Sequence, residues 1–174
     1  SSGKYWLRLM QEDFCQATAT AHQTKYEAEG GPGLTDIGRI LQGSVEREAD
    51  LTTIFKAQLL FWMLAATDGH AKNFSIRLLP GGRYRLTPLY DVLSVWPIVG
   101  DGGSQIPIKR VKLAMALHSK NTHYRVKDIQ RRHFDGLATQ LRLARDSRSL
   151  IDEVIEATPR VIAQVQGEVA AGFP

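Results

Sequence analysis

The longest periodic pattern of apolar residues in the chain lies between Asp50 and Ala66. Leu51, Phe55, Leu59 and Trp62 recur there every three or four positions, which is the spacing of residues on one face of an α-helix. Further apolar residues fill most of the remaining circumference, as is typical of a helix buried on several sides. The pattern therefore predicts a central, buried helix over this segment.

Shorter helical patterns lie on both sides of it. They predict a short helix over Arg8–Thr18, with Leu9 turned inward, and a second helix that carries Leu34 and Leu41 and stops near Gly43. Near the C-terminus they predict a helix within His133–Arg145 and further helical structure after it. Pro159 suits the first turn of a separate last helix.

A change of pattern follows the central helix. The segments Phe74–Leu79 and Arg83–Leu86 have the composition of short strands and are separated by Pro80-Gly81-Gly82, so they predict a β-hairpin. Between helix and hairpin, the segment Thr67–Asn73 has five polar residues among its seven. The fold class predicted is mainly α, with one small hairpin after the central helix.

The polar segment contains Asp68 and Asn73, five positions apart. The catalytic loop of protein kinases has an Asp and an Asn at the same offset, and a second Asp that binds Mg²⁺ follows a hairpin. Asp91 stands in the corresponding place. Since Mg²⁺ requires oxygen ligands, these three residues are candidates for a site around one phosphate. From spacing alone, an Asp-Gly turn and a capping Asn remain the alternative.

Composition and charge indicate the general class of protein but do not identify its partner. The net charge of +4, with 43% hydrophobic and 23% charged residues, indicates a globular protein and permits an anionic partner without requiring one. The single cysteine, Cys15, excludes a disulfide within the chain and fits a cytoplasmic location. No apolar stretch is long enough for a membrane span.

His70 lacks the histidine partners of a zinc site, so we expect it to orient Asp68 or to contact phosphate.

The residues of this region also carry a family resemblance. Ala66–Ser75 (ATDGHAKNFS) and Tyr84–Asp91 (YRLTPLYD) closely resemble the HipA family, the serine/threonine kinase toxins of bacterial type II toxin–antitoxin systems. The resemblance covers nearly the whole chain. Other similar stretches are Gln11-Glu12-Asp13, Lys25-Tyr26-Glu27, Gly30-Gly31-Pro32-Gly33 and Lys112-Leu113-Ala114-Met115.

The resemblance implies that residues 1–174 form most of the helical C-terminal lobe of a two-lobed kinase-like fold that uses ATP and Mg²⁺. It implies that Asp68 is the general base and that Asn73 and Asp91 hold Mg²⁺. The residues it places at the nucleotide site are Gln11, His70, Lys72, Asn73, Tyr90 and Asp91.

The resemblance also implies a reaction and partners. The family transfers the ATP γ-phosphate to a protein serine, in glutamyl-tRNA synthetase for its best-known member. Members bind a HipB-type helix-turn-helix antitoxin, and the complex binds its operator DNA. Arg142 matches a DNA-contacting position, whereas a lysine expected one turn earlier is Thr139 here.

Departures from ordinary kinases favour the HipA pattern. Ala66-Thr67 stand where ordinary kinases have His-Arg, and Tyr90-Asp91-Val92 replaces Asp-Phe-Gly. No glycine-rich loop with a strand-borne lysine precedes Gln11, so we expect the N-terminal lobe to lie outside the chain and residues 1–174 alone to have little kinase activity. Two alternatives stay open: a non-catalytic module that binds antitoxin and DNA, and a Mg²⁺-dependent phosphohydrolase that uses Asp68, His70 and Asp91.

Overall fold

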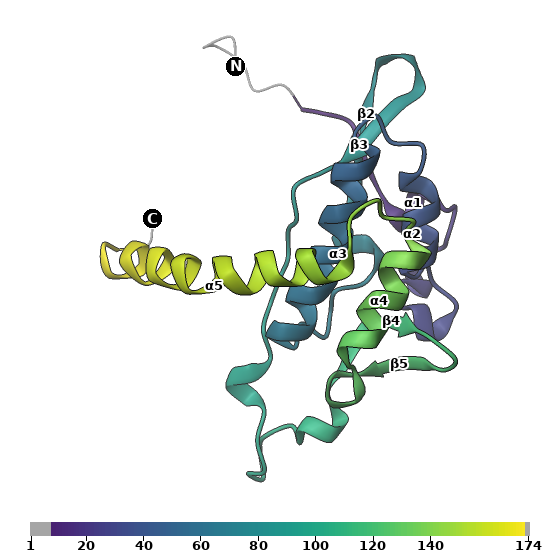
Figure 1. Ribbon diagram of the computed structural model, residues 1–174. Coiled ribbons are helices and arrows are strands. Elements are labelled where there is room, and N and C mark those ends of the chain that lie inside the picture. The colour runs from purple at the N-terminus through teal and green to yellow at the C-terminus, as the bar shows by residue number, and fades with distance from the viewer. Residues whose placement is uncertain (1–7, 173–174) are drawn as a thin grey trace.

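The computed structural model describes residues 8–172, and it is mainly helical with two small antiparallel sheets (Figure 1). The helices are α1 (Phe14–Ala17), α2 (Leu34–Leu41), α3 (Arg47–Leu64), α4 (Arg131–Gln140) and α5 (Ser147–Ala170). The strands are β1 (Gln11–Asp13), β2 (Ser75–Leu79), β3 (Arg83–Leu86), β4 (Lys112–His118) and β5 (Thr122–Arg125). The predicted mainly-α fold class is confirmed.

Helix α3 is the central element, with the other long helices packed around it (Figure 1). Phe55 is fully buried, and its ring meets Phe134 of α4 edge-on at 6.1 Å between centroids. The helix ends at Leu64, earlier than predicted, because Ala65 takes a left-handed conformation with φ +49°. Burial is incomplete on one side, where Leu60 is 36% exposed.

The first sheet has the order β1-β2-β3, with β2 and β3 joined at Pro80–Gly82. The helix predicted from Arg8 is wrong for its first half, because Gln11–Asp13 pair with β2 instead. Asp13 also caps the following helix, since its carboxylate accepts from the Gln16 backbone N–H at 2.9 Å and so favours a start at Phe14. Leu9 is consequently 57% exposed rather than turned inward.

The hairpin formed by β4 and β5 was not predicted from the sequence. Its first strand is buried from Leu113 to Leu117 and packs beside α4. A short, continuous run of apolar residues has the same appearance in a buried strand and in a buried helix. The segment is a strand because it pairs with β5. The local pattern of apolar residues contains no information about that pairing.

The last helix also differs from its prediction. A separate helix starting near Pro159 is wrong, because α5 continues through Pro159 as one helix of 24 residues. Asp146 caps it by accepting from the Ser149 N–H at 3.3 Å. The second half of α5 extends away from the body (Figure 1), and its apolar residue Ile162 is 51% exposed. Along residues 8–172, none of the helices combines the length and apolar character needed for a membrane span.

Candidate functional site

The polar segment predicted to carry the chemistry lies on a buried aromatic pair. Phe61, in the last turn of α3, packs against Phe74 at 5.5 Å between ring centroids. Gly69 lies directly over the Phe61 ring, where an added Cβ would come within 2.2 Å of two ring atoms. The close approach requires glycine and holds the loop between Thr67 and Asn73 against the core.

Asp68 is fixed at one carboxylate oxygen and open at the other. Its Oδ1 accepts a hydrogen bond of 2.7 Å from the Tyr26 hydroxyl. The Nε2 atom of His70 lies 3.6 Å from the same oxygen, too far for a hydrogen bond. The Asp68 side chain is 57% exposed, and its Oδ2 makes no hydrogen bond with any residue between 8 and 172. This oxygen is available to a ligand.

His70 lies beneath Asp68 and is buried. Its backbone N–H donates to the Asn73 side-chain oxygen at 3.1 Å, and its ring meets Tyr26 edge-on. Burial, followed by the charge of Lys25, lowers the pKa of His70, so the ring is neutral at neutral pH. The structure thus places this imidazole inside the site, where it supports the loop.

Asn73 and Asp91 join the loop to the segment after the hairpin. The Asn73 amide donates to Asp91 Oδ2 at 2.8 Å. Asp91 has φ +58°, a left-handed conformation that is uncommon for a residue other than glycine. Such conformations cluster at functional sites, where the surrounding structure holds them. The two residues predicted to share a metal ion are therefore in direct contact.

Tyr90 and Lys72 complete this side of the site. The Tyr90 hydroxyl donates to the Lys72 carbonyl at 2.7 Å and accepts from Ser75 Oγ at 2.6 Å. Burial raises the pKa of Tyr90, so the phenol stays protonated. The Lys72 ammonium lies 3.5 Å from the Asp13 carboxylate, at the end of β1.

Gln11 lies on the same strand as Asp13 but further from the site. It is exposed and lines a separate cavity of about 450 Å³ with Arg77 and Arg85. Asp68 and Asp91 instead share a cavity of about 120 Å³, whose remaining wall includes Phe61. The structure thus brings together every predicted nucleotide-site residue except Gln11, which is linked to them only through β1.

The side chains present fit a Mg²⁺ ion that arrives with a nucleotide. Within residues 8–172, no group of three His, Cys, Asp or Glu side chains could hold a metal ion alone. Mg²⁺ commonly takes only one or two protein carboxylates and completes its shell with phosphate oxygens and water. Asp91 supplies a carboxylate of the required kind, and its Oδ2 accepts from the Asn73 amide nitrogen. The Asn73 amide oxygen accepts from the His70 N–H at 3.1 Å and keeps a second lone pair for a cation.

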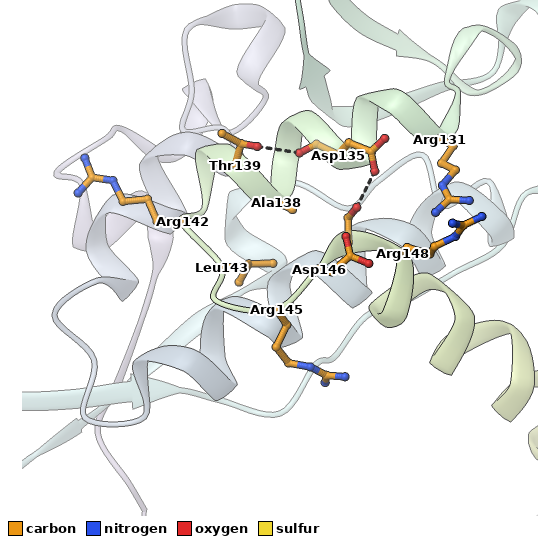
Figure 2. Close-up of a pocket in the computed structure, with 10 residues that line it drawn as sticks. Arg131, Asp135, Ala138, Thr139, Arg142, Leu143, Arg145, Asp146 and Arg148 are labelled. Carbon is orange, nitrogen blue, oxygen red and sulfur yellow. Dashed lines mark hydrogen bonds between the residues drawn. The ribbon is translucent and has the colours of Figure 1, made fainter.

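Arg142 lies apart from this site, beside an arginine-lined cavity of about 760 Å³ between α4 and α5 (Figure 2). In this view the side chains of Arg131 and Arg148 end in the same region, whereas that of Arg142 points away from them. Arg145 is neutralised by an ion pair with Glu153. The other three arginines make no ion pair within the described part of the chain.

Tyr26 contacts the candidate site, and sequence reasoning did not identify it as a site residue. It lies within a stretch that resembles the HipA family, yet no local pattern connects it with Asp68, 42 positions later. Only the folded chain brings the two side chains together. Its position between two charged residues, Lys25 and Glu27, gave no signal of this contact.

Comparisons with known proteins identify proteins similar to this chain. A protein of Sinorhizobium fredii named "Putative kinase Y4mE" is 40% identical over 88 residues, which cover 50% of this chain and 21% of that protein. The structure of the Shewanella oneidensis MR-1 HipA, HipB and operator DNA complex matches with a TM-score of 0.74 at 22% identity, over 91% of this chain and 37% of the matched chain. That likeness shows a shared fold, and the chain spans well under two thirds of either protein.

The comparison with protein-family models covers most of the chain. The model of the HipA-like C-terminal domain matches residues 3–162, which include Asp68, Asn73 and Asp91. The resemblance predicted from the motifs is thereby confirmed, and the chain belongs to the HipA-like C-terminal domain family.

Proposed function

We propose that the chain is the catalytic C-terminal lobe of a two-lobed kinase that transfers the γ-phosphate of ATP to a serine or threonine hydroxyl of a protein. The contact that carries the proposal is the Asn73–Asp91 hydrogen bond of 2.8 Å, together with the cavity that Asp91 shares with Asp68. A general base and the oxygen donors for a cation thus meet on one face of the domain. The kinase name of the Sinorhizobium fredii relative supports the reaction class.

Each group has a defined part in the transfer. Asp68 Oδ2 accepts the proton of the attacking hydroxyl, whose oxygen forms the new bond to the γ-phosphorus while the bond to the ADP oxygen breaks. Asp91 and Asn73 would hold Mg²⁺, which would supply positive charge to neutralise the phosphates. Lys72 supplies a positive charge beside the site, and the buried His70 fixes the loop that carries the base. Catalysis of this kind depends mainly on positioning and charge neutralisation.

Partners follow from the family and are part of the proposal. The structural neighbour is a complex with HipB and operator DNA, which supports a HipB-like helix-turn-helix antitoxin and operator DNA as partners of this chain. The proposed substrate is glutamyl-tRNA synthetase, the target of the best-known family member, and the proposed location is the bacterial cytoplasm.

The test is a phosphotransfer assay on the full natural protein that contains this chain. The protein is incubated with γ-labelled ATP, Mg²⁺ and glutamyl-tRNA synthetase, and labelled protein is separated from free phosphate. Labelled protein supports the kinase. Free phosphate without labelled protein indicates the phosphohydrolase, and neither product indicates a non-catalytic binding module. Residues 1–174 alone are expected to transfer little phosphate in the same assay.

The Asp91→Asn substitution separates cation binding from folding. Asparagine tolerates the left-handed backbone of Asp91 and keeps its size, so the fold should persist while a negative charge is lost. We expect the Mg²⁺ concentration needed for half-maximal ATP binding to rise at least about tenfold, which calorimetric titration measures. Asp101→Asn, in an exposed loop, is the control. An unchanged Mg²⁺ requirement in Asp91→Asn would exclude Asp91 as a ligand.

The arginine-lined cavity favours DNA as a partner of the complex. Arg131 and Arg148 both line this cavity and make no ion pair within residues 8–172. Unpaired guanidinium groups in a concave surface suit the phosphates of a DNA backbone. We therefore propose that this pair contacts operator phosphate, with Arg142, the position implied by the resemblance, at the edge of the contact.

Replacing both Arg131 and Arg148 by alanine should weaken operator binding by the antitoxin complex. If each contacts one phosphate, the slope of log affinity against log salt should become shallower by about one per arginine, without a change in sequence preference. Titrations of labelled operator at several salt concentrations measure the slope. Arg83→Ala, at the tip of the β2–β3 hairpin, is the matched control. Equal slopes for the double variant and the natural protein would contradict the contact.

A further inference from the structure

The proposed general base has one side-chain hydrogen bond within residues 8–172, and a tyrosine supplies it. The Tyr26 hydroxyl donates to Asp68 Oδ1 at 2.7 Å, while Asp68 Oδ2 stays open. The phosphotransfer steps given above make no use of Tyr26. A hydroxyl aimed at one oxygen of an otherwise exposed base therefore requires an explanation of its own.

Tyr26 is itself held on several sides. Its ring lies 5.2 Å from the His70 ring in an edge-on arrangement, and Lys25 Nζ lies 4.9 Å from its centroid. Its backbone carbonyl accepts from the N–H groups of Glu29 and Gly31. A tyrosine restrained at both ring and backbone can fix the group to which it donates.

The neighbouring residue ties this segment to the second sheet. Glu27 accepts from the Ala116 backbone N–H of β4 at 2.6 Å and pairs with His118 at 2.6 Å. Its side chain also fills the space beside Gly33, where an added Cβ would come within 2.4 Å of Glu27 Oε1. The segment that carries Tyr26 is thus fixed to β4 through Glu27, in addition to the hydrogen bonds of its own local turn.

A carboxylate exposed to water rotates about its last side-chain bond, because torsions of this kind are broad. A hydrogen bond to a charged oxygen restricts that rotation and is stronger than one between neutral groups. With Oδ1 engaged by Tyr26, Oδ2 is presented toward solvent, where an acceptor hydroxyl can approach. The pKa of Tyr26 is raised chiefly by this bond to Asp68, so its hydroxyl remains a donor at neutral pH.

We propose that Tyr26 is a positioning residue of the kinase site, which holds the Asp68 carboxylate so that Oδ2 faces the acceptor hydroxyl. The inference rests on the proposed function of Asp68 as general base. It assigns a role to the segment Lys25-Tyr26-Glu27, which the phosphotransfer steps leave unused. The contacts of Tyr26 and Glu27 with Asp68 and β4 carry it.

The Tyr26→Phe variant of the full natural protein tests the proposal. Phenylalanine keeps the ring against His70 and beneath Lys25 and removes only the hydroxyl. We expect kcat for phosphotransfer to fall about tenfold, equivalent to about 1.4 kcal/mol on the barrier. The KM for ATP should stay within about twofold, since a group that acts only on the base does not contribute to ground-state binding of nucleotide.

A double-mutant cycle identifies the residue through which Tyr26 acts. In the Asp68→Asn background, Tyr26→Phe should cause no further loss, because the base it positions is already gone. Tyr84→Phe is the control: it also removes a tyrosine hydroxyl bond of 2.7 Å, to the Ile40 carbonyl, but remote from Asp68. It should lower the melting temperature and leave kcat unchanged.

The results of these variants distinguish failure of the Tyr26 proposal from failure of the kinase proposal. Independent, multiplicative losses from Tyr26→Phe and Asp68→Asn, or an unchanged kcat in Tyr26→Phe, would overturn the role of Tyr26 while leaving the kinase proposal intact. Full activity in Asp68→Asn would instead refute the proposed function on which the inference rests.

Discussion

Replacing Asp68 by asparagine is expected to lower the rate of phosphotransfer by about 10²–10⁴-fold, the usual contribution of a positioned general base. The carboxamide cannot take the proton of the attacking hydroxyl. The fold should be retained, because the side chain is 57% exposed and Tyr26 can still donate to the amide oxygen. The loss should therefore appear in kcat and not in stability.

Single-turnover transfer from γ-labelled ATP measures this effect, and thermal unfolding and ATP titration check the fold and the nucleotide site. Asp152→Asn, on the exposed surface of α5, makes the same chemical change away from the site and should retain full activity. A variant at Asp68 that transfers phosphate at the natural rate, with the same Mg²⁺ dependence, would remove Asp68 from the mechanism.

Replacing Gly69 by alanine is expected to damage both stability and activity. The new Cβ would lie 2.2 Å from two atoms of the buried Phe61 ring, which is itself packed against Phe74. Either the ring or the loop must move, and overpacking of this kind costs about 1–3 kcal/mol. Since Asp68 precedes the glycine directly, displacement of the loop should also lower kcat, because positioning errors of about 1 Å strongly reduce rates.

Chemical denaturation measures the first effect and the phosphotransfer assay the second. Gly167→Ala is the matched control, because an added Cβ there meets nothing within 4 Å and the residue lies inside α5. Alanine in a helix interior should raise the free energy of unfolding by about 0.5–1 kcal/mol. Natural stability and activity in Gly69→Ala would show that the Phe61 contact does not hold the loop.

Local patterns were sufficient for the elements that bury a regular face. The period of Leu51, Phe55 and Leu59 predicted α3, and the spacing of Leu34 and Leu41 predicted α2. These predictions succeed because helical burial repeats along the chain itself. The offset between Asp68 and Asn73 likewise identified the candidate site, because a short loop carries both residues.

Elements decided by distant partners were not predictable in this way. Gln11–Asp13 became a strand through pairing with β2, and Leu113–Leu117 became one through the β4–β5 pairing. Backbone hydrogen bonds to a remote segment outweigh weak local propensity. In α5, the helix continued through Pro159, although proline removes one of its backbone hydrogen bonds.

The sequence by itself thus determined the family, the mainly helical class and the identity of Asp68, Asn73 and Asp91 as candidates, since motif spacing and hydrophobic period are properties of neighbouring residues. The tertiary structure alone decided that Asn73 contacts Asp91, that His70 is buried, and that the Tyr26 hydroxyl donates to Asp68. These features depend on burial and on side chains brought together from separate segments. No local sequence pattern encodes these contacts, because they form only when the core and the two sheets are packed.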